Sequence, residues 1–483
     1  MPLKATRRPT AATLIQDPRI DGRRADLRCR AGRIAALAER LEPLPGETCI
    51  SAAGGALLPG LHDHHLHLFS LAAARSSLRC GPPAVRDRDE LRQALERAAT
   101  RNGWIRGYGY HEEVAGPLDR RDLDEFRTDT PLRIQHRSGA MWILNSAALR
   151  ALGDENAAQL ERSPDGTPSG RLYRADDWLQ QRLSRLGDSA PPSLTEVSSE
   201  LARYGVSGLT DATPANDAAT LVHFRHALTS GALRQRLLLM GSEALPPAHS
   251  EELRLATHSL KIALTETSLP AFESLVQRIV QAHRRDRPVA IHCVTRAELV
   301  LALEALREAG CSRADRIEHA SIAPPECVDS LRVLGVSVVT QPSFVRERGD
   351  SYLRDVAEVD VPWLYRCRGL LDSGVPLAGG TDAPYGDPDP WLAMAAALDR
   401  QTELGSVLQA EESLDPESAL ALFTGPPLDP GGRQRTLEVG ADADLCLLDR
   451  SWERARDRLD SGLIRATLVA GEVVYLRDAG SGS

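Results

Sequence analysis

The stretch "LPGLHDHHLHLF", residues 58–69, decides the reading of the whole chain. Four of the 13 histidines and one aspartate fall within six consecutive positions, residues 62–67. Pro59 and Gly60 mark a turn just before this run. The apolar residues on both sides are typical of a buried strand, and a surface histidine tract would not usually have them. We therefore expect a buried strand whose polar side chains have a chemical role.

Side chains alternate between the two faces of a strand. Asp63, His65 and His67 are predicted to share one face, whereas His62 and His64 point away from it. Two imidazoles placed two residues apart lie side by side, which is a chelating geometry for a first-row divalent metal. The stretch predicts a metal site.

The bulk composition indicates a large soluble globular protein. The 483 residues suit a barrel with an accessory domain, and 42% hydrophobic and 26% charged residues are ordinary values. A net charge of -9 argues against nucleic acid or an anionic membrane as the main partner. No apolar run reaches membrane-spanning length, and the start lacks the apolar core of a secretory signal. The eight cysteines are scattered, which favours reduced thiols in the cytoplasm.

The two ends of the chain differ from its middle. Short β-rich runs separated by turns fill residues 1–58 and 426–483, so we expect one small β-sandwich built from both ends. Residues 59–425 are predicted to form a metal-dependent barrel. Two long insertions, near 70–130 and 150–195, are predicted to be lids over its mouth, because loops after barrel strands lie there.

Strand-like and helix-like stretches alternate through the middle, which indicates βαβ units and a parallel sheet. With the histidine-rich strand there are nine such runs, close to the eight strands of a barrel, so the expected fold class is α/β with a TIM (β/α)8 barrel. An open doubly wound sheet is the weaker alternative, because no GxGxxG or P-loop pattern follows a strand. The further strand-like runs are "LRIQHRSG", "VSGLTDATP", "RQRLLLMG", "LKIALTE", "PVAIHCV", "DRIEHAS", "VSVVTQPS" and "VPLAGGTDAP".

Polar residues stand where three of these runs end. His292 ends "PVAIH", His319 ends "DRIEH", and Asp382 follows "VPLAGGT". Polar residues at the carboxyl ends of TIM-barrel strands are typically catalytic. A lone buried histidine is more often a hydrogen-bonded core residue, but four strand ends agree here.

Lysine is rare enough to be informative. It occurs only at Lys4 and Lys261, and arginine serves elsewhere. Arginine cannot become a neutral amine at working pH, so a retained lysine invites a chemical reason. A carbamate formed from Lys261 and carbon dioxide would turn a costly buried cation into an anionic bridging ligand. A lysine that pairs with an acid such as Glu266 is the alternative.

The motifs "PGLHDHHLHL", "LKI", "AIH", "RIEHA" and "GGTDAP" together resemble the amidohydrolase superfamily. The segments "GPLDRRDLDEF", "SGAMWILNSAAL" and "DGTPSGRL" are similar to its amidohydrolase-3 division, the YtcJ-like proteins. The closing "VGADADLCLLD" also resembles this superfamily, so the resemblance covers nearly the whole chain.

The resemblance implies a ligand set and a reaction. His65, His67 and Asp382 would bind one divalent metal, His292 and His319 a second, and carboxylated Lys261 would bridge them. Zinc is the expected metal, with iron, manganese or nickel as alternatives. Metal-generated hydroxide would attack an amide carbonyl, and Asp382 would carry the proton to the leaving nitrogen.

Substrate contacts are predicted at His111 in "GYGYHEE", at Trp142 past a strand end, and at Gln341, which ends "VSVVTQ". Arg346 and Arg348 could meet a carboxylate, although an arginine-rich chain makes that a weak signal.

The sequence thus predicts a metal-dependent hydrolase of a non-peptide C–N bond in an N-acyl, N-formyl or N-substituted amide. A one-metal aminohydrolase that deaminates a heterocycle is the alternative within enzymes. A non-catalytic binding protein on the same barrel is the alternative from another class. The partner expected is a small-molecule substrate, and homodimers are common among similar proteins.

Overall fold

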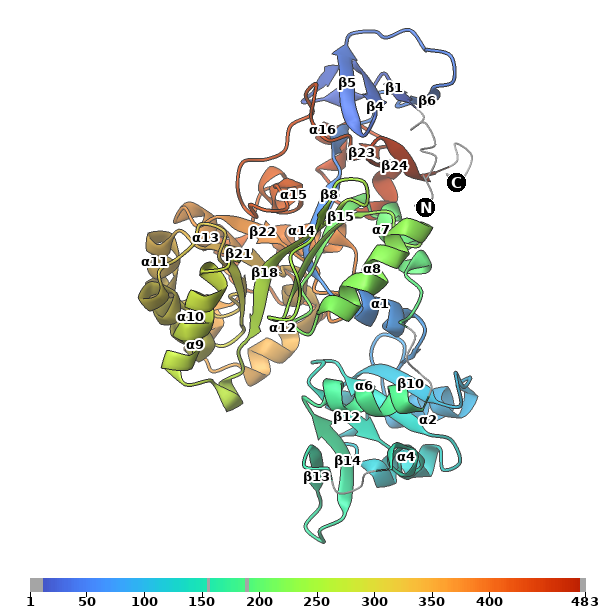
Figure 1. Ribbon diagram of the computed structural model, residues 1–483, viewed down its shortest axis with the longest axis vertical. Coiled ribbons are helices and arrows are strands. Elements are labelled where there is room, and N and C mark those ends of the chain that lie inside the picture. Colours follow the sequence, from blue (N-terminus) through green and yellow to red (C-terminus); the bar gives the residue numbers. More distant parts are fainter. Residues whose placement is uncertain (1–11, 154–156, 187–190, 478–483) are drawn as a thin grey trace, which may run out of the picture. The chain divides into compact units, whose positions relative to one another are not determined.

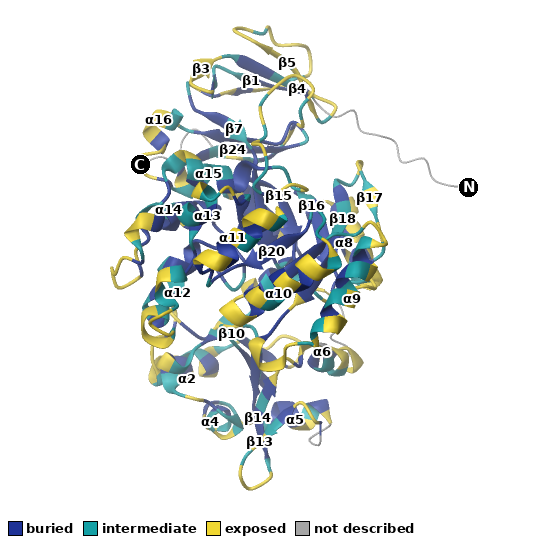
Figure 2. Ribbon diagram, turned by 90° about the vertical axis from the view of Figure 1, so that its left-hand side faces the viewer, coloured by how far each residue is buried: buried dark blue, intermediate teal, exposed yellow. Residues whose placement is uncertain are grey.

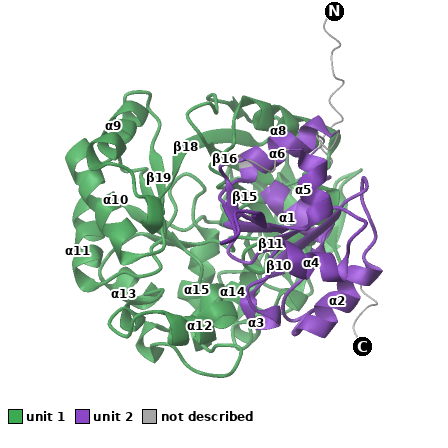
Figure 3. Cartoon of the chain, turned by 90° about the horizontal axis from the view of Figure 1, so that it is seen from below, with its two compact units in different colours: residues 1–67, 194–483 green, residues 68–193 purple. Residues whose placement is uncertain are grey.

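The structure is a computed structural model that describes residues 12–153, 157–186 and 191–477. Outside them lie 1–11, with Lys4, and 478–483 from the predicted sandwich, and 154–156 and 187–190 from the second predicted insertion. The chain divides into two compact units (Figure 3). One comprises residues 1–67 and 194–483, and the other comprises residues 68–193.

Eight strands of the first unit form a parallel barrel sheet (Figure 1). Thr381, just past the last strand, donates hydrogen bonds from its backbone N and from Oγ1 to Asp63 on the first, which brings the two ends of the sheet together. The predicted α/β class and TIM-barrel fold are confirmed. The strands are, in sheet order, β8 (Leu61–Leu66), β15 (Val206–Asp211), β16 (Arg236–Gly241), β18 (Leu255–Ala263), β19 (Val289–Cys293), β20 (Arg316–His319), β21 (Ser337–Thr340) and β22 (Leu377–Gly379).

Amphipathic helices separate these strands. α10 (Arg296–Ala309) starts at a capping box between Thr295 and Glu298 and buries Leu299 and Leu303 on one face. Figure 2 shows this pattern as a buried sheet behind helices with exposed outer turns. No helix in the described ranges is long and apolar enough to cross a membrane. The others include α7 (Thr195–Arg203), α8 (Ala218–Ser230), α9 (Phe272–His283), α11 (Pro325–Leu334), α12 (Ser343–Asp355), α13 (Cys367–Asp372), α14 (Pro390–Asp399) and α15 (Pro416–Thr424).

One predicted barrel strand belongs elsewhere. The run "LRIQHRSG" contains β11 (Leu132–His136), which pairs with β10 (Ile105–Tyr110) and β12 (Met141–Leu144) in a different sheet. Its apolar pattern identified a buried strand correctly, but such a pattern does not tell which sheet the strand joins. The remaining eight runs are the eight barrel strands.

Residues 68–193 form their own sheet and cores. The six strands run in the order β13-β14-β12-β11-β10-β9, and Ile134 and Ile143 are fully buried in one of the cores beside the sheet. The other elements are β9 (Leu78–Arg79), β13 (Leu160–Arg162), β14 (Pro168–Tyr173), α1 (Leu68–Arg75), α2 (Arg88–Arg97), α3 (Glu112–Ala115), α4 (Arg120–Phe126), α5 (Ser146–Leu152) and α6 (Asp176–Arg185).

Two four-stranded sheets from the chain ends share one apolar core. Ile15 and Leu27 from the beginning and Leu447 and Leu468 from the end are all fully buried in it. The first sheet has the order β5-β4-β1-β6, and the second has the order β25-β24-β23-β7. Their strands are β1 (Thr13–Gln16), β4 (Asp26–Arg30), β5 (Arg33–Ala38), β6 (Thr48–Ser51), β7 (Leu57–Pro59), β23 (Leu445–Leu448), β24 (Ile464–Val469) and β25 (Glu472–Leu476).

The junction of β22 with β8 yields a stability prediction. A Cβ at Gly380 would stand 2.5 Å from Cβ of His65 and 2.8 Å from its backbone N. Gly380→Ala should therefore lower the free energy of unfolding by about 1–3 kcal/mol, the usual cost of overpacking, measured by urea denaturation. Gly425→Ala is the matched control, because its Cβ would meet neighbours only at 3.7 and 3.9 Å. Equal stability of the two variants would contradict the close approach.

Candidate metal centre

β8 presents two imidazoles to one shared space. His65 is buried within the strand and His67 follows its end, so both point to the same face. Their Nε2 atoms lie 3.4 and 3.2 Å from Oδ1 of Asp382. One ligand atom from each of these three residues lies within 4.8 Å of the other two. This predicted trio is thus brought together.

Asp382 reaches this space because the turn after β22 is fixed to β8. The backbone N of Asp382 donates to the carbonyl oxygen of His65 at 2.7 Å, and the N of His67 donates to that of Ala383 at 2.8 Å. The carboxylate of Asp63 also accepts from the backbone N of His65 at 3.0 Å. Burial raises the pKa of Asp63 to about 7, although the hydrogen bonds that its carboxylate accepts from Thr381 and His65 oppose the shift. The carboxylate of Asp63 is therefore engaged by His65 and Thr381 and fixes the backbone on both sides of the junction.

The other two predicted histidines continue the cluster. The ring of His319 lies 4.8 Å from that of His65 and 4.5 Å from that of His292, measured between centroids. His319 has a φ of +70°, unusual for a residue with a side chain, which re-aims it at the end of β20. Four imidazoles from three strand ends therefore adjoin one another.

Three of these rings are held through Nδ1, which leaves Nε2 for the shared space. His65 Nδ1 lies 2.5 Å from Glu318 Oε2, His67 Nδ1 lies 2.9 Å from Thr213 Oγ1, and His319 Nδ1 lies 2.6 Å from Gln341 Oε1. Metal-binding histidines usually show such a second partner, which fixes the ring and its tautomer. The donor set therefore fits a bound divalent metal.

The protonation states agree with this fit. Burial and the nearby charge of Lys261 lower the pKa of His65 to about 3, and burial also lowers the pKa of His292 and His319. Imidazoles must be neutral to bind a metal. Burial opposes ionisation of Asp382, but a hydrogen bond from His67 and the adjacent histidines hold its pKa below the usual value. The site thus offers neutral nitrogens and one anionic oxygen.

Lys261 lies on β18 and is almost fully buried. Its Nζ stands 3.6 Å from Oε1 of Glu318 and has no hydrogen-bond partner in the part of the chain that the structure describes. Burial lowers the pKa of Lys261 to about 8, while Glu318 opposes that shift. The acid beside this lysine is Glu318, and not Glu266, which was the alternative considered from the sequence.

Glu318 is the main residue that the sequence reasoning missed. It is fully buried and accepts from His65 Nδ1 and from Nε of Arg316, the latter at 2.6 Å. Burial opposes its charge, but Arg316, Lys261 and His65 hold the pKa of Glu318 well below its usual range. An arginine and a glutamate two apart in a buried strand, as in "RIEH", were the available signal, because such residues need partners.

The predicted substrate contacts lie in different places. Trp142 is 5% exposed, packs in a core of residues 68–193, and donates from Nε1 to Asp176 at 2.8 Å. His111 lies in the same unit, after β10. Gln341 lies in the barrel beside His319, and its Nε2 has no hydrogen-bond partner among the described residues.

Two arginines considered as carboxylate contacts differ in their partners. Arg346 forms an ion pair with Asp399 at 2.5 Å. Arg348 donates to the carbonyl oxygen of Tyr385 at 2.6 Å and lies over the ring of Phe344. The Tyr385 ring is in turn 5.4 Å from that of His67, so Arg348 is the nearer of the two to the cluster.

His62 and His64 make separate contacts. Nε2 of His62 lies 2.9 Å from Oγ1 of Thr210, and the ring centroids of His62 and His64 lie 4.6 Å apart. Both are fully enclosed, and burial lowers the pKa of each well below its usual value. They are neutral packing residues on the face opposite the ligands.

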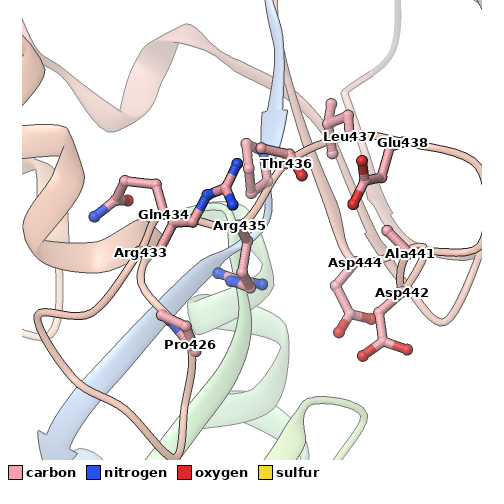
Figure 4. A pocket seen from close by; sticks show the side chains of 11 residues that line it. Pro426, Arg433, Gln434, Arg435, Thr436, Leu437, Glu438, Ala441, Asp442 and Asp444 are labelled. Atoms are coloured by element: carbon pink, nitrogen blue, oxygen red, sulfur yellow. The ribbon is translucent and has the colours of Figure 1, made fainter.

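A cavity of about 440 Å³ lies away from the cluster (Figure 4). Its charged lining residues are Arg433, Arg435, Glu438, Asp442 and Asp444, and none of the predicted ligands lines it. Asp444 accepts from Arg236, and Arg435 donates to the carbonyl oxygen of Gly60, so two of its main charges are already engaged. The cavity offers no donor set comparable to the histidine cluster.

Comparisons with known proteins agree with this geometry. The sequence profile of the amidohydrolase family matches residues 48–475. The chain is 25% identical to an N-substituted formamide deformylase of Arthrobacter pascens, across 92% of this chain and 94% of that protein. It is 24% identical to YtcJ of Bacillus subtilis strain 168, across 88% and 90%.

A solved structure shows the same fold. The uncharacterized metal-dependent hydrolase of Pyrococcus horikoshii superposes with a TM-score of 0.73 at 21% identity, covering 91% of this chain and 98% of that one. The resemblance read from the motifs is confirmed, because the matched family region contains all the strand-end residues of the cluster. The chain belongs to the amidohydrolase family and is a hydrolase acting on C–N bonds.

Proposed function

We propose that this protein hydrolyses a non-peptide C–N bond in an N-acyl, N-formyl or N-substituted amide. The observation that carries the proposal is the convergence of three Nδ1-anchored imidazoles and the Asp382 carboxylate on one space. A relative named as an N-substituted formamide deformylase, 25% identical, supports the substrate class.

In this proposal, His65, His67 and Asp382 hold one divalent metal, and His292 and His319 hold a second. Zinc suits these nitrogen and oxygen donors, with iron, manganese or nickel as alternatives. The bound metals supply an acidified water and a polarised carbonyl. Thr213, Glu318 and Gln341 keep the imidazoles oriented through Nδ1.

Asp382 is the proposed proton carrier. Its Oδ1 faces the space between the two β8 histidines, where an attacking water would sit. The carboxylate accepts a proton from that water and delivers it to the leaving nitrogen, so an amide yields a carboxylic acid and an amine. Gln341 is the proposed contact for the substrate carbonyl, because its Nε2 remains available beside His319.

The bridging role of Lys261 is proposed on its position. It lies on the barrel strand next to that of His292, and its buried Nζ lacks a hydrogen-bond partner among described residues. Reaction of the neutral amine with carbon dioxide gives a carbamate and releases one proton. Such an anion would offset part of the positive charge of two metals.

A one-metal aminohydrolase of a heterocycle is the second candidate, and one observation favours it. The 3.6 Å contact between Lys261 Nζ and Glu318 suits an unmodified ammonium, which would leave no bridge between two metals. The cytoplasm is the proposed location, since all eight cysteines are free thiols.

Metal content separates these candidates. Protein purified without chelator and supplied with bicarbonate should hold about two equivalents per chain by plasma mass spectrometry, since the proposal assigns five donors and a carbamate bridge to two metals. Lys261→Ala and Lys261→Arg should each lower the content toward one equivalent. His249→Gln, at an exposed histidine, is the matched control. One equivalent of metal that does not change in the Lys261 variants, together with release of ammonia from amino-heterocycles, would identify the protein as the aminohydrolase.

Asp382→Asn tests the proton carrier. The kcat for hydrolysis of N-substituted formamides and N-acyl amines should fall about 10²–10⁴-fold, the usual contribution of general acid–base catalysis. Amine release is measured alongside metal content, so that loss of a ligand and loss of proton transfer are told apart. A wild-type kcat at full metal occupancy would rule out the assigned role.

Glu318→Gln tests the buried acid. Loss of the charge that orients His65 should weaken metal binding about 10–100-fold in chelator competition, as outer-shell changes typically do. Unpaired Arg316 should also lower the free energy of unfolding by about 3–5 kcal/mol. Glu304→Gln, at an exposed ion pair with Arg307, is the control and should change neither quantity. Unaltered metal affinity would mean that Glu318 has only a structural role.

A further inference from the structure

The second unit contains a separate cluster of potential metal ligands. The sequence of residues 68–193 contains two histidines, His111 and His136, and their ring centroids lie 5.8 Å apart. Glu112 stands between them, and one ligand atom from each of the three residues lies within 4.8 Å of the other two. All three belong to residues 68–193, so this cluster is independent of the barrel centre.

The backbone explains how the two histidines meet. β10 and β11 are parallel neighbours, and Tyr110 at the end of β10 is paired with His136 at the end of β11. The register shifts between Gly107 and Tyr110, where Gly109 has a φ of +74°. Bulges of this kind re-aim side chains at the end of a strand. His111, the next residue, is thus directed toward its neighbour strand.

The contacts converge on one carboxylate oxygen. Oε2 of Glu112 lies 3.0 Å from Nε2 of His136 and 3.7 Å from Nε2 of His111. Such separations suit donors that share one cation, because Zn–N and Zn–O bonds of about 2.0–2.2 Å span them. Two nitrogens and one carboxylate oxygen form a common zinc ligand set.

Both imidazoles have a second partner at Nδ1. His136 Nδ1 lies 2.7 Å from Oγ of Ser138, and His111 Nδ1 lies 3.3 Å from a carboxylate oxygen of Glu113. The backbone N–H groups of Ser138 and Glu113 also donate to these Nδ1 atoms, at 3.2 and 3.4 Å. A cation at Nε2 therefore requires each ring to carry its proton on Nδ1, where the hydroxyl of Ser138 and the carboxylate of Glu113 can accept it.

Accessibility and charge permit loading from solvent. The side chains of His111 and His136 are 14% and 15% exposed, whereas that of Glu112 is 42% exposed, so the carboxylate marks the entrance. Burial and the charge of Arg137 lower the pKa of His111, which favours its neutral form. Arg137 also repels a cation, so the expected affinity is below that of the barrel centre.

We propose that His111, Glu112 and His136 form an additional site for a zinc-class divalent cation. The proton of His136 Nε2, which Glu112 accepts in this structure, moves to Nδ1, where Oγ of Ser138 accepts it in a hydrogen bond, and the cation takes the lone pair of Nε2. Three protein ligands leave a coordination position for water. The site ties the end of β10 to the end of β11 and takes His111 away from the predicted role of substrate contact.

The test counts zinc bound to the full-length chain by equilibrium dialysis at micromolar free Zn²⁺. Wild-type protein should bind one equivalent of zinc more than the His136→Gln and His111→Gln variants. In each variant the affinity of the additional site should fall more than about 100-fold, which exceeds the usual effect of losing an outer-shell partner. Glu112→Gln should weaken the same equivalent. His249→Gln is the histidine control, and circular dichroism verifies folding.

Asp382→Asn in the wild-type and His136→Gln backgrounds makes the assignment unambiguous. The difference of one equivalent should persist when the barrel centre is impaired, so failure of the proposed hydrolase function would leave this result intact. Equal zinc content of folded wild-type, His136→Gln and Glu112→Gln proteins would overturn the proposal and leave an ordinary Glu112–His136 hydrogen bond.

Discussion

The meeting of the first and last barrel strands is the constraint on which the site depends. Asp63 on β8 accepts hydrogen bonds from Thr381 after β22 and from His65 on its own strand, so one carboxylate fixes both strands at the level of the ligands. Gly380 permits the approach, because a side chain there would collide with His65. Asp382, two residues after Gly380, then lies beside His65 and His67. The contacts that join the first and last strands therefore also place His65, His67 and Asp382 beside one another.

Glu318 balances the charges that this assembly buries. It lies among His65, Arg316 and Lys261, and it is completely removed from solvent. A buried carboxylate alone would carry a large desolvation cost, whereas each partner here supplies either a hydrogen bond or an opposite charge. Arg316 donates further to the carbonyl oxygen of His64, which connects this network to β8 at 2.9 Å. The proposed metal ligands are thus supported by a buried ionic network inside the barrel, as a preorganised centre requires.

The sequence allowed the fold and most of the cluster to be predicted, for identifiable reasons. Period-two alternation separates His65 and His67 from His62 and His64, and the barrel rule places His292, His319 and Asp382 at strand ends. Neither rule reports partners across strands. The contact of Glu318 with His65 joins β20 to β8, and the contact of Gln341 with His319 joins the end of β21 to β20; both depend on tertiary geometry. The same gap explains the strand 132–136, whose local pattern could not show which sheet it joins.

Backbone strain at two ligands completes the physical picture. His319 and Asp382 both have positive φ, at +70° and +55°, and such conformations cost about 1–3 kcal/mol each in residues with side chains. A hydrogen bond holds each residue in this position. The ring of His319 is bound to Gln341, and the backbone N of Asp382 donates to the carbonyl oxygen of His65. His319 and Asp382 are two of fifteen described non-glycine residues with positive φ, and at both of them the conformation lies at a strand end where the side chain joins the other proposed ligands.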